Sequence, residues 1–203
     1  KNLKKYLTLA GKILNIKKCK IFYNSSWFKK AGVEKILELS RASSLQQTLK
    51  RADFQERMNV SNDISMLELW YPLFQGYDSV MVKADLEVGG TDQKFNLLMG
   101  RRVQRYFGMK EQNIMTLSLI EGTDGTKKMS KSSGNYIALD AEPNDVYGKI
   151  MSVPDSLMKK YFMTLTDITE SGFSKLSLLE QKKLLARNVV SSLHTPEDAE
   201  RAE

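Results

Sequence analysis

One short segment gathers residue types that bind phosphate. Residues 121–135 read E-G-T-D-G-T-K-K-M-S-K-S-S-G-N, in which Lys127, Lys128 and Lys131 stand among glycines and small hydroxyl side chains. Glycine permits backbone conformations that are closed to other residues, and a lysine ammonium group suits phosphate oxygens. The segment therefore has the composition of a mobile loop that closes on a polyphosphate. Composition by itself favours a solvated basic connector, so the order of the residues has to decide between the two.

Polar residues also line one side of an apolar helix candidate. Apolar side chains cover most of the circumference of the predicted helix Ile64–Val82, which indicates a buried helix. Tyr71, Gln75 and Asp78 fall at i, i+4 and i+7, so they form one stripe along it. A buried carboxylate or amide without a partner costs roughly 1–3 kcal/mol. The stripe therefore either pairs internally or faces a polar ligand.

A strand followed by two glycines and a helix start forms the third candidate. The strand is Leu86–Val88, the second glycine is Gly90, and Thr91 is the predicted cap of a helix over residues 92–107. Glycines let a ligand approach the backbone, and a helix start offers free N–H groups, so the geometry is compatible with a nucleotide. Asp92 would repel a phosphate there and suits a ribose hydroxyl or an ammonium group better.

The basic segment also follows a strand. Residues 114–120 have the pattern of a short strand that leads directly into residues 121–135. In an α/β sheet, ligands bind beyond the carboxyl ends of the strands. This position favours the phosphate-binding interpretation of the loop.

The order of residues in the loop is far more specific than its composition. Five consecutive residues spell the K-M-S-K-S signature of class I aminoacyl-tRNA synthetases: Lys128, Met129, Ser130, Lys131 and Ser132. The flanking text, V-G-G-T-D-Q-K-F-N-L-L-M-G-R before it and S-G-N-Y-I after it, resembles the bacterial type of tyrosyl-tRNA synthetase. The resemblance covers residues 21–161 well and the rest loosely.

The resemblance implies a reaction and a set of binding residues. Such an enzyme activates L-tyrosine with ATP to tyrosyl-adenylate and then esterifies the terminal ribose of tRNA(Tyr). Lys128 and Lys131 would be the catalytic residues on the triphosphate, with Mg²⁺ held by the phosphates and no protein metal ligands. The implied ATP-binding residues are Gly90, Asp92, Lys128, Met129, Ser130, Lys131 and Ser132. The implied tyrosine-binding residues are Tyr71 and Gln75 at the ammonium group, Asp78 at the phenol, and Gln93.

The elements that must position these residues indicate an α/β protein. The fold class implied is the C-terminal half of a Rossmann-like class I catalytic domain, residues 1–140, followed by a truncated α-helical anticodon-stem-binding domain, residues 141–203. A β-like run over Lys20–Asn24 precedes a brief helix that stops at Gly32. The other predicted helices are residues 2–16, 33–41, 44–59, 145–151, 156–165 and 176–193, with a further helix start at Thr195.

Composition bounds the remaining possibilities. The 203 residues are 41% hydrophobic, enough for one good core with a small helical appendage. A net charge of +7 favours an acidic partner such as nucleic acid, although Lys-rich proteomes share it. A single cysteine excludes an internal disulfide and fits the cytoplasm, and no apolar run is long enough to span a membrane. The chain begins without Met, so we expect a fragment, and the resemblance implies a homodimer.

Two departures and two alternatives qualify the resemblance. Glu87 stands where some members of the family have Gln, and the H-I-G-H signature of class I enzymes cannot be present because the chain has one histidine, His194. We therefore expect the isolated chain to be inactive. The tryptophan-specific sister enzymes share the loop and the fold, but Asp78 favours a phenol. A synthetase-like RNA-binding protein without activation chemistry would not need an intact K-M-S-K-S loop.

Overall fold

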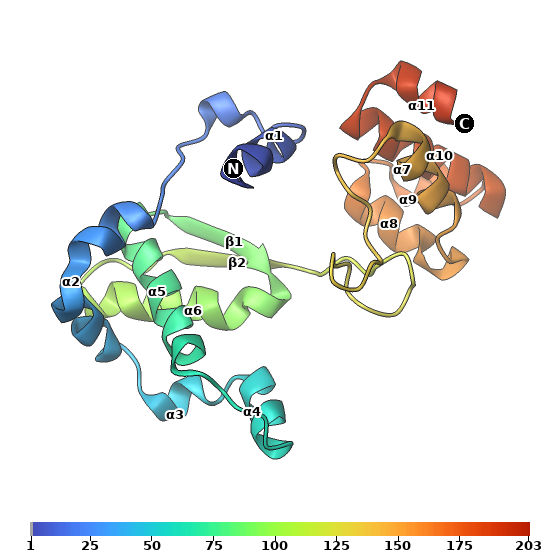
Figure 1. Cartoon of the computed structure of the whole chain (residues 1–203). Coiled ribbons are helices and arrows are strands. Elements are labelled where there is room, and N and C mark those ends of the chain that lie inside the picture. Colours follow the sequence, from blue (N-terminus) through green and yellow to red (C-terminus); the bar gives the residue numbers. More distant parts are fainter. Residues whose placement is uncertain (1) are drawn as a thin grey trace. The chain divides into compact units, whose positions relative to one another are not determined.

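The computed structural model describes residues 2–203, which divide into two compact units (Figure 1). The sheet unit is Ile21–Ser118, and the helical unit combines Leu119–Glu203 with the N-terminal residues up to Lys20. The compact units divide at Leu119, and the domain boundary expected at residue 140 stays a prediction. The basic loop is part of the helical unit because its flanking residues pack against the helices that follow it.

The sheet unit carries both strands that the structure describes. Its helices and strands are α2 (Ser25–Ser40), α3 (Leu45–Thr48), α4 (Ala52–Asn59), α5 (Met66–Val82), β1 (Leu86–Gly90), α6 (Lys94–Tyr106) and β2 (Asn113–Leu117). The helical unit contains α1 (Asn2–Ala10), α7 (Pro143–Met151), α8 (Met158–Leu165), α9 (Glu170–Phe173), α10 (Leu178–Leu193) and α11 (Pro196–Ala202). The expected α/β fold class is confirmed.

The two strands are parallel, with a helix between them in sequence. β1 pairs with β2 from Leu86 opposite Asn113 to Gly90 opposite Leu117. Parallel neighbours need a crossover connection, which α6 supplies. Both carboxyl ends therefore lie at one edge of the sheet, and the chain leaves that edge at Leu117 toward the basic loop.

Helices α5 and α6 pack closely beside the strands, and α5 crosses α6 in Figure 1. A Cβ added at Gly76 would lie 2.7 Å from a methyl carbon of Val103, and one at Gly100 would lie 2.6 Å from the Ser79 hydroxyl. The small residues thus allow the helix backbones to approach. The buried core of this unit is Leu39, Ala42, Leu73, Tyr77, Val80, Met99 and Val103.

A polar network joins the same elements. The Ser79 hydroxyl donates to Glu87 Oε2 at 2.9 Å, and the Gln112 side-chain amide donates to the same carboxylate oxygen. Gln104 Oε1 accepts from the Gln112 backbone N–H at 2.8 Å. Because buried polar groups destabilise a fold unless they are paired, this network stabilises one register of α5, β1, α6 and β2.

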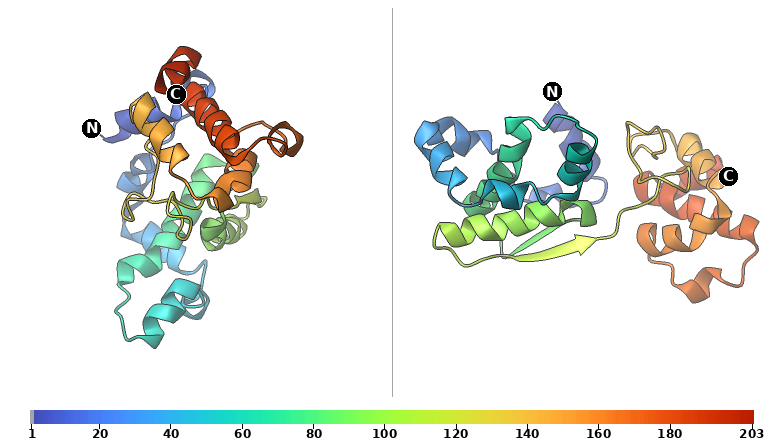
Figure 2. Two further views of the ribbon diagram at one scale, coloured as in Figure 1. Left: turned by 90° about the vertical axis from the view of Figure 1, so that its right-hand side faces the viewer. Right: turned by 90° about the horizontal axis from the view of Figure 1, so that it is seen from below.

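The helical unit has its own core. In both views of Figure 2, α7 to α11 gather into one group with the preceding loop against it. Their largest fully buried residues include Tyr161, Phe162, Ile150 and Leu185, and Ile120, Met129 and Ile137 pack against that cluster from the loop segment. All helices among residues 2–203 are too short or too polar to cross a membrane.

Several predicted elements differ from the structure. Residues 20–24 form no strand, since this extended run has no ladder partner among the described residues. The helix predicted over residues 44–59 is two helices, because Arg51 between them is extended, with its guanidinium paired to Asp53 and stacked 4.3 Å from the Phe54 ring. The break at Gly32 is confirmed as a kink within α2, where Gly32 has φ 64°.

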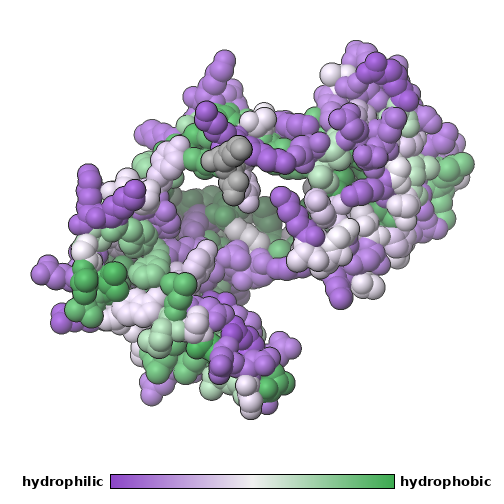
Figure 3. All heavy atoms as spheres, viewed as in Figure 1, coloured by the Kyte–Doolittle hydropathy of each residue, from purple (hydrophilic) through white to green (hydrophobic). Residues whose placement is uncertain are grey.

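Helix α5 is less buried than its sequence indicates. Its buried residues are Pro72, Leu73, Gly76, Tyr77, Ser79 and Val80, whereas Met66 and Leu67 are more than two-thirds exposed, at 68% and 69%. Figure 3 shows hydrophobic side chains reaching the surface of the sheet unit in this view. One face of α5 therefore packs on α6, and another remains open.

Candidate functional site: an amino-acid pocket and a basic loop

The polar stripe of α5 lines a cavity in the sheet unit. Tyr71, Gln75 and Asp78 border an open cavity of about 670 Å³. The rest of its lining comes from Asn24, Phe28, Ile36 and Phe74. The stripe was predicted either to pair internally or to face a ligand. Its residues face this cavity, and Tyr71 is 60% exposed.

Among the described residues that line this cavity, Asp78 is the only one with a carboxylate. The Trp27 indole N–H of α2 donates to Asp78 Oδ1 at 2.8 Å. Partial burial raises the pKa of Asp78 above its ordinary value, while hydrogen bonds from Trp27 and Asn24 oppose that rise. The carboxylate is therefore oriented by a neutral donor and keeps its capacity to accept another hydrogen bond.

Aromatic rings form the apolar wall beside this carboxylate. Phe28 meets Phe74 edge to face, with ring centroids 5.4 Å apart, and Trp70 stacks on Phe74 at 5.9 Å. Edge-to-face and offset contacts of this kind fix ring orientations. An apolar cavity with one oriented acid suits an aromatic ligand that carries a hydrogen-bond donor.

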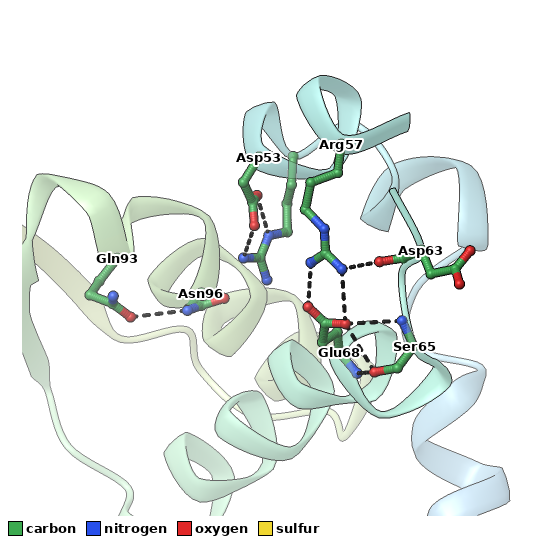
Figure 4. A network of polar contacts seen from close by, with 8 residues as sticks. Asp53, Arg57, Asp63, Ser65, Glu68, Gln93 and Asn96 are labelled. Atoms are coloured by element: carbon green, nitrogen blue, oxygen red, sulfur yellow. Dashed lines mark hydrogen bonds and ion pairs between the residues drawn. The ribbon is translucent and has the colours of Figure 1, made fainter. Parts of the chain in front are cut away.

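The residues after β1 do not line this cavity. Gly90 ends β1, Asp92 is exposed, and Gln93 follows in a short 3-10 turn. Gln93 Oε1 accepts from the Asn96 side-chain amide at 3.0 Å (Figure 4), and the buried side-chain oxygen of Asn96 has no protein partner. Their expected roles toward tyrosine and ATP remain predictions.

Glu87 also points elsewhere. Its carboxylate accepts from Ser79 and Gln112 in the polar network described above. The residue that departs from the family pattern thus acts within the packing of α5 against the sheet. It is absent from the lining of the cavity.

The K-M-S-K-S segment forms a short ordered hairpin in the helical unit. Glu121 and Lys128 make an isolated antiparallel bridge, and the Gly122 N–H donates to the Lys127 carbonyl at 2.7 Å. The Met129 N–H donates to the Ile120 carbonyl at 2.8 Å. Lys128 and Lys131 themselves are exposed.

The base of this hairpin is fastened to α8. The Tyr161 hydroxyl donates to the Glu121 carbonyl oxygen at 2.7 Å, and Lys160 pairs with the Glu121 carboxylate at 2.5 Å. Burial, with the nearby charges of Glu121 and Asp124, raises the pKa of Tyr161 to about 12. The phenol therefore stays protonated and remains a donor throughout the neutral pH range.

Lys131 also borders a small cavity within the helical unit. The cavity has a volume of about 240 Å³, and its other lining residues are Lys5, Tyr6 and Leu9 of α1. Lys5 pairs with Asp140 at 2.6 Å, just beyond the hairpin. The serines of the signature bond to one another, since the Ser130 hydroxyl lies 2.8 Å from that of Ser133 and 3.3 Å from that of Ser132.

Polar contacts between α4 and the N-terminus of α5 fix the start of α5. Arg57 pairs with Glu68 and donates to the Asp63 carbonyl, and Glu68 accepts from the Ser65 backbone N–H at 2.9 Å (Figure 4). Ser65 in turn accepts from the Glu68 N–H, which completes a capping box. Arg57 first, then Ser65, lowers the pKa of Glu68 to about 2.

Metal ligands were not expected. Among the described residues, no group of three or more His, Cys, Asp or Glu side chains is placed to hold a metal ion.

A parallel β-α-β unit, a cavity with one oriented acid and a K-M-S-K-S hairpin define a class of synthetase. The family model described as tRNA synthetases class I (W and Y) matches residues 1–203. The chain belongs to this family of class I tRNA synthetases.

Its curated relatives include tyrosine–tRNA ligases. That of Aquifex aeolicus is 42% identical over an alignment of 205 positions that covers 99% of this chain and 52% of that protein. That of Burkholderia lata is 43% identical over an alignment of 209 positions that covers 99% of this chain and 51% of that protein. The chain thus spans about half the length of these relatives.

Solved structures of tyrosyl-tRNA synthetases share the fold. The enzyme of Archaeoglobus fulgidus, crystallised with L-tyrosine, matches with a TM-score of 0.70 at 22% identity, over 99% of this chain and 72% of that one. The Aeropyrum pernix enzyme matches with a TM-score of 0.71 at 16% identity, over 97% and 69%. At these identities, the likeness concerns the fold.

Sequence reasoning missed most of the cavity lining. Asn24, Phe28 and Ile36 line the cavity from α2 and its N-cap. Trp27, which donates to Asp78, is 51 residues from it in the chain. No local spacing reports a contact of that length. The contacts of Asn135 in the hairpin were also missed, although its position three residues after the signature was visible.

Proposed function

We propose that this chain is part of a tyrosine–tRNA ligase, which activates L-tyrosine with ATP and transfers it to tRNA(Tyr). The observation that carries the proposal is the cavity of the sheet unit, where Asp78 is oriented by Trp27 beside aromatic walls. A carboxylate accepts equally from a phenol O–H and an indole N–H, so Asp78 alone does not decide between tyrosine and tryptophan. The identity of the relatives favours tyrosine.

The proposed roles follow the positions of the side chains. Asp78 accepts the phenol O–H, and Tyr71 and Gln75 bind the ammonium group from the same helix face. Gln93 completes the tyrosine site. The ATP site uses Gly90 and Asp92 after β1 and the signature residues Lys128 to Ser132.

The proposed first step is an in-line displacement at phosphorus. A carboxylate oxygen of tyrosine attacks the α-phosphorus of ATP, a P–O bond forms, and the bond to the departing pyrophosphate breaks. Negative charge grows on the phosphate oxygens as this happens. The exposed ammonium groups of Lys128 and Lys131 would stabilise that charge, and Mg²⁺ would arrive as part of the MgATP substrate.

The remaining parts of the proposal concern the partners. The helices over residues 141–203 would bind the anticodon stem of the tRNA, as the family resemblance implies. The net charge of +7 belongs to the whole chain, because this segment holds 8 Lys and Arg against 10 Asp and Glu. We also propose a cytoplasmic homodimer, a state to which the exposed apolar residues Val33, Leu37 and Leu67 of the sheet unit could contribute. The molar mass of the full-length protein in solution would test the dimer.

Substitution of Asp78 tests the proposed pocket. In the full-length protein, Asp78→Ala should sharply lower tyrosine-dependent ATP–pyrophosphate exchange and remove most of the preference for tyrosine over phenylalanine. Tyrosyl-tRNA synthetases are themselves the reference case for this preference, about 10⁵, so that magnitude belongs to the family and was not obtained from this structure. Asp78→Asn keeps the shape of the side chain and guards against misfolding.

Asp167→Ala is the matched control, because it removes an exposed carboxylate elsewhere in the chain. The control should leave both the exchange rate and the selectivity unchanged. If both Asp78 variants retained the activity and the selectivity of the wild type, Asp78 would not contact the substrate.

A further inference from the structure

Asn135 is buried at the end of the basic hairpin. It directly follows Gly134 and is only 4% exposed, whereas Lys128, Lys131 and Ser132 of the signature are exposed. A buried side-chain amide must have its donors and acceptor paired, so its partners indicate what it stabilises.

All side-chain partners of Asn135 lie within the hairpin. Its Nδ2 donates to Asp124 Oδ2 at 2.8 Å, to the Lys128 carbonyl at 3.2 Å and to the Lys127 carbonyl at 3.4 Å. Its Oδ1 accepts from the Ser130 backbone N–H at 2.9 Å. One amide therefore binds the backbone on both sides of Met129.

The opposite arm of the hairpin is shaped around this amide. A Cβ added at Gly122 would lie 2.1 Å from Asn135 Nδ2, so only glycine leaves room for it. The Thr123 N–H donates to the Asn135 carbonyl at 2.9 Å. Asp124 uses its other oxygen to accept from the Thr126 and Lys127 N–H groups at 3.0 and 3.1 Å.

The hydrogen bonds of Asn135 hold a segment that has no regular secondary structure. The described hairpin has an isolated bridge at Glu121 and Lys128 but no strand ladder and no helix. The backbone from Lys128 to Ser130 therefore depends on the Asn135 amide for its conformation. Because the amide is buried and fully paired, it is not available to contact a phosphate itself.

We propose that Asn135, held by Asp124, is a positioning residue for adenylate formation. It fixes the backbone of Lys128 to Ser130 before ATP binds. The signature lysines then reach the triphosphate without the loss of conformational entropy that ordering a flexible loop would require. This inference rests on the proposed function for its kinetic consequence. The ordering of the hairpin by Asn135 is independent of that function.

The kinetic test uses the full-length protein and single-turnover adenylate formation. Asn135→Ala should lower the rate constant with saturating tyrosine and ATP by about 10²-fold, the scale on which misplacement of catalytic groups acts. The dissociation constant for tyrosine should not change, because the pocket lies in the other unit. Asn188→Ala, an exposed asparagine of α10, should change neither quantity.

A reversed pair distinguishes positioning from general damage to the fold. Asn135→Asp places two carboxylates against each other at Asp124 and should be as slow as the alanine variant. In the double variant Asp124→Asn with Asn135→Asp, the amide and the carboxylate exchange places, and the bond between them can form again. We expect the double variant to recover about 10-fold of the lost rate relative to Asn135→Asp alone.

Hydrogen exchange gives a readout that does not require activity. The Ser130 N–H should exchange at least about 10-fold faster in Asn135→Ala than in the wild type, because its acceptor is gone. Unchanged exchange at Ser130, or an unchanged rate of adenylate formation in an active protein, would overturn the inference. A wild-type protein that forms no adenylate would instead contradict the proposed function, and the exchange result would still decide the role of Asn135.

Discussion

Asp78 and Trp27 show how a single hydrogen bond prepares the pocket. The ionised carboxylate is a stronger hydrogen-bond acceptor than the protonated acid, and burial raises the pKa of Asp78. The indole N–H of Trp27 opposes that rise, since it stabilises the ionised form. The described residues that line the pocket include no cation, so the neutral donors Trp27 and Asn24 are what oppose the rise.

Removal of the indole donor should shift the pH dependence of tyrosine binding. In Trp27→Phe, the pKa of Asp78 should rise further. As the pH is lowered, the affinity for tyrosine should therefore begin to fall at a higher pH in this variant than in the wild type. At neutral pH, we expect affinity about 10-fold weaker, the scale of one lost hydrogen bond to a charged group. Equilibrium dialysis with labelled tyrosine at several pH values would measure both effects.

Trp70→Phe is a suitable control for this variant. It makes the same change of ring on α5, where Trp70 stacks on Phe74. Its affinity can change, but the pH at which binding is lost should stay that of the wild type. An identical pH profile for Trp27→Phe and the wild type would mean that the Trp27 bond does not govern the ionisation of Asp78.

Contacts between residues close in sequence could be predicted, and contacts between distant residues could not. Tyr71, Gln75 and Asp78 share one helix, so their spacing alone placed them on one stripe. Trp27 contacts Asp78 across 51 residues, and no local pattern records such a contact. Asn135 was visible three residues after the signature, but its burial depends on the fold of the whole hairpin.

Element α5 begins at a charged cluster that connects it to α4. Glu68 accepts from the Ser65 N–H within the capping box and pairs with Arg57 of α4. The pKa of Glu68 is about 2 in the folded chain, well below its ordinary value of 4.5. A carboxyl with a lowered pKa stabilises the fold above its ordinary pKa, and this contribution disappears as the pH falls toward the folded value.

Substitution of Glu68 should therefore have a pH-dependent effect on stability. Glu68→Gln should lower the midpoint of thermal unfolding near pH 7, and the difference from the wild type should vanish between about pH 4.5 and pH 2. Circular dichroism at several pH values would follow this difference. Because the site is exposed to solvent, added salt should reduce the effect.

Glu180→Gln provides the comparison, since Glu180 forms the same capping box with Ser177 but has no arginine partner. Its effect should be smaller and should disappear at a higher pH. Equal pH profiles for the two variants would show that Arg57 contributes nothing beyond the capping box.

Helices were easier to predict than their boundaries. The start of α11 at Thr195 was confirmed, because a cap, a proline and an acidic first turn are all local signals. The strands β1 and β2 were also predicted, although β2 ends at Leu117 and not at Ile120. The strand predicted at residues 20–24 was wrong, since a strand depends on a partner that a local pattern does not report.

At the scale of the whole molecule, the two units carry different parts of the proposed chemistry. The proposed tyrosine pocket lies in the sheet unit, and the basic hairpin belongs to the helical unit, where Tyr161 and Lys160 bind its base. The sequence predicted a change of character at residue 140. It did not predict that the hairpin packs against the helices. Ile120, Met129 and Ile137 are apolar, but their sequence pattern does not indicate whether they pack in the core of the sheet unit or of the helical unit.

The family itself was recognisable from the sequence, but the substrate requires an experiment. K-M-S-K-S occurs in the class as a whole, and the matching family model covers both W and Y synthetases. The tyrosine–tRNA ligases among the relatives are about twice as long as the matched chain. The choice between tyrosine and tryptophan is therefore the central claim to test.

Amino-acid-dependent ATP–pyrophosphate exchange by the full-length protein tests that claim most directly. Tyrosine, tryptophan and phenylalanine would be compared at equal concentrations, with the formation of tyrosyl-tRNA measured in parallel. We predict rapid exchange with tyrosine, little with the other two, and esterification of tRNA with tyrosine only. Exchange that depends on tryptophan, or binding of tRNA with no exchange for any of the three amino acids, would contradict the account.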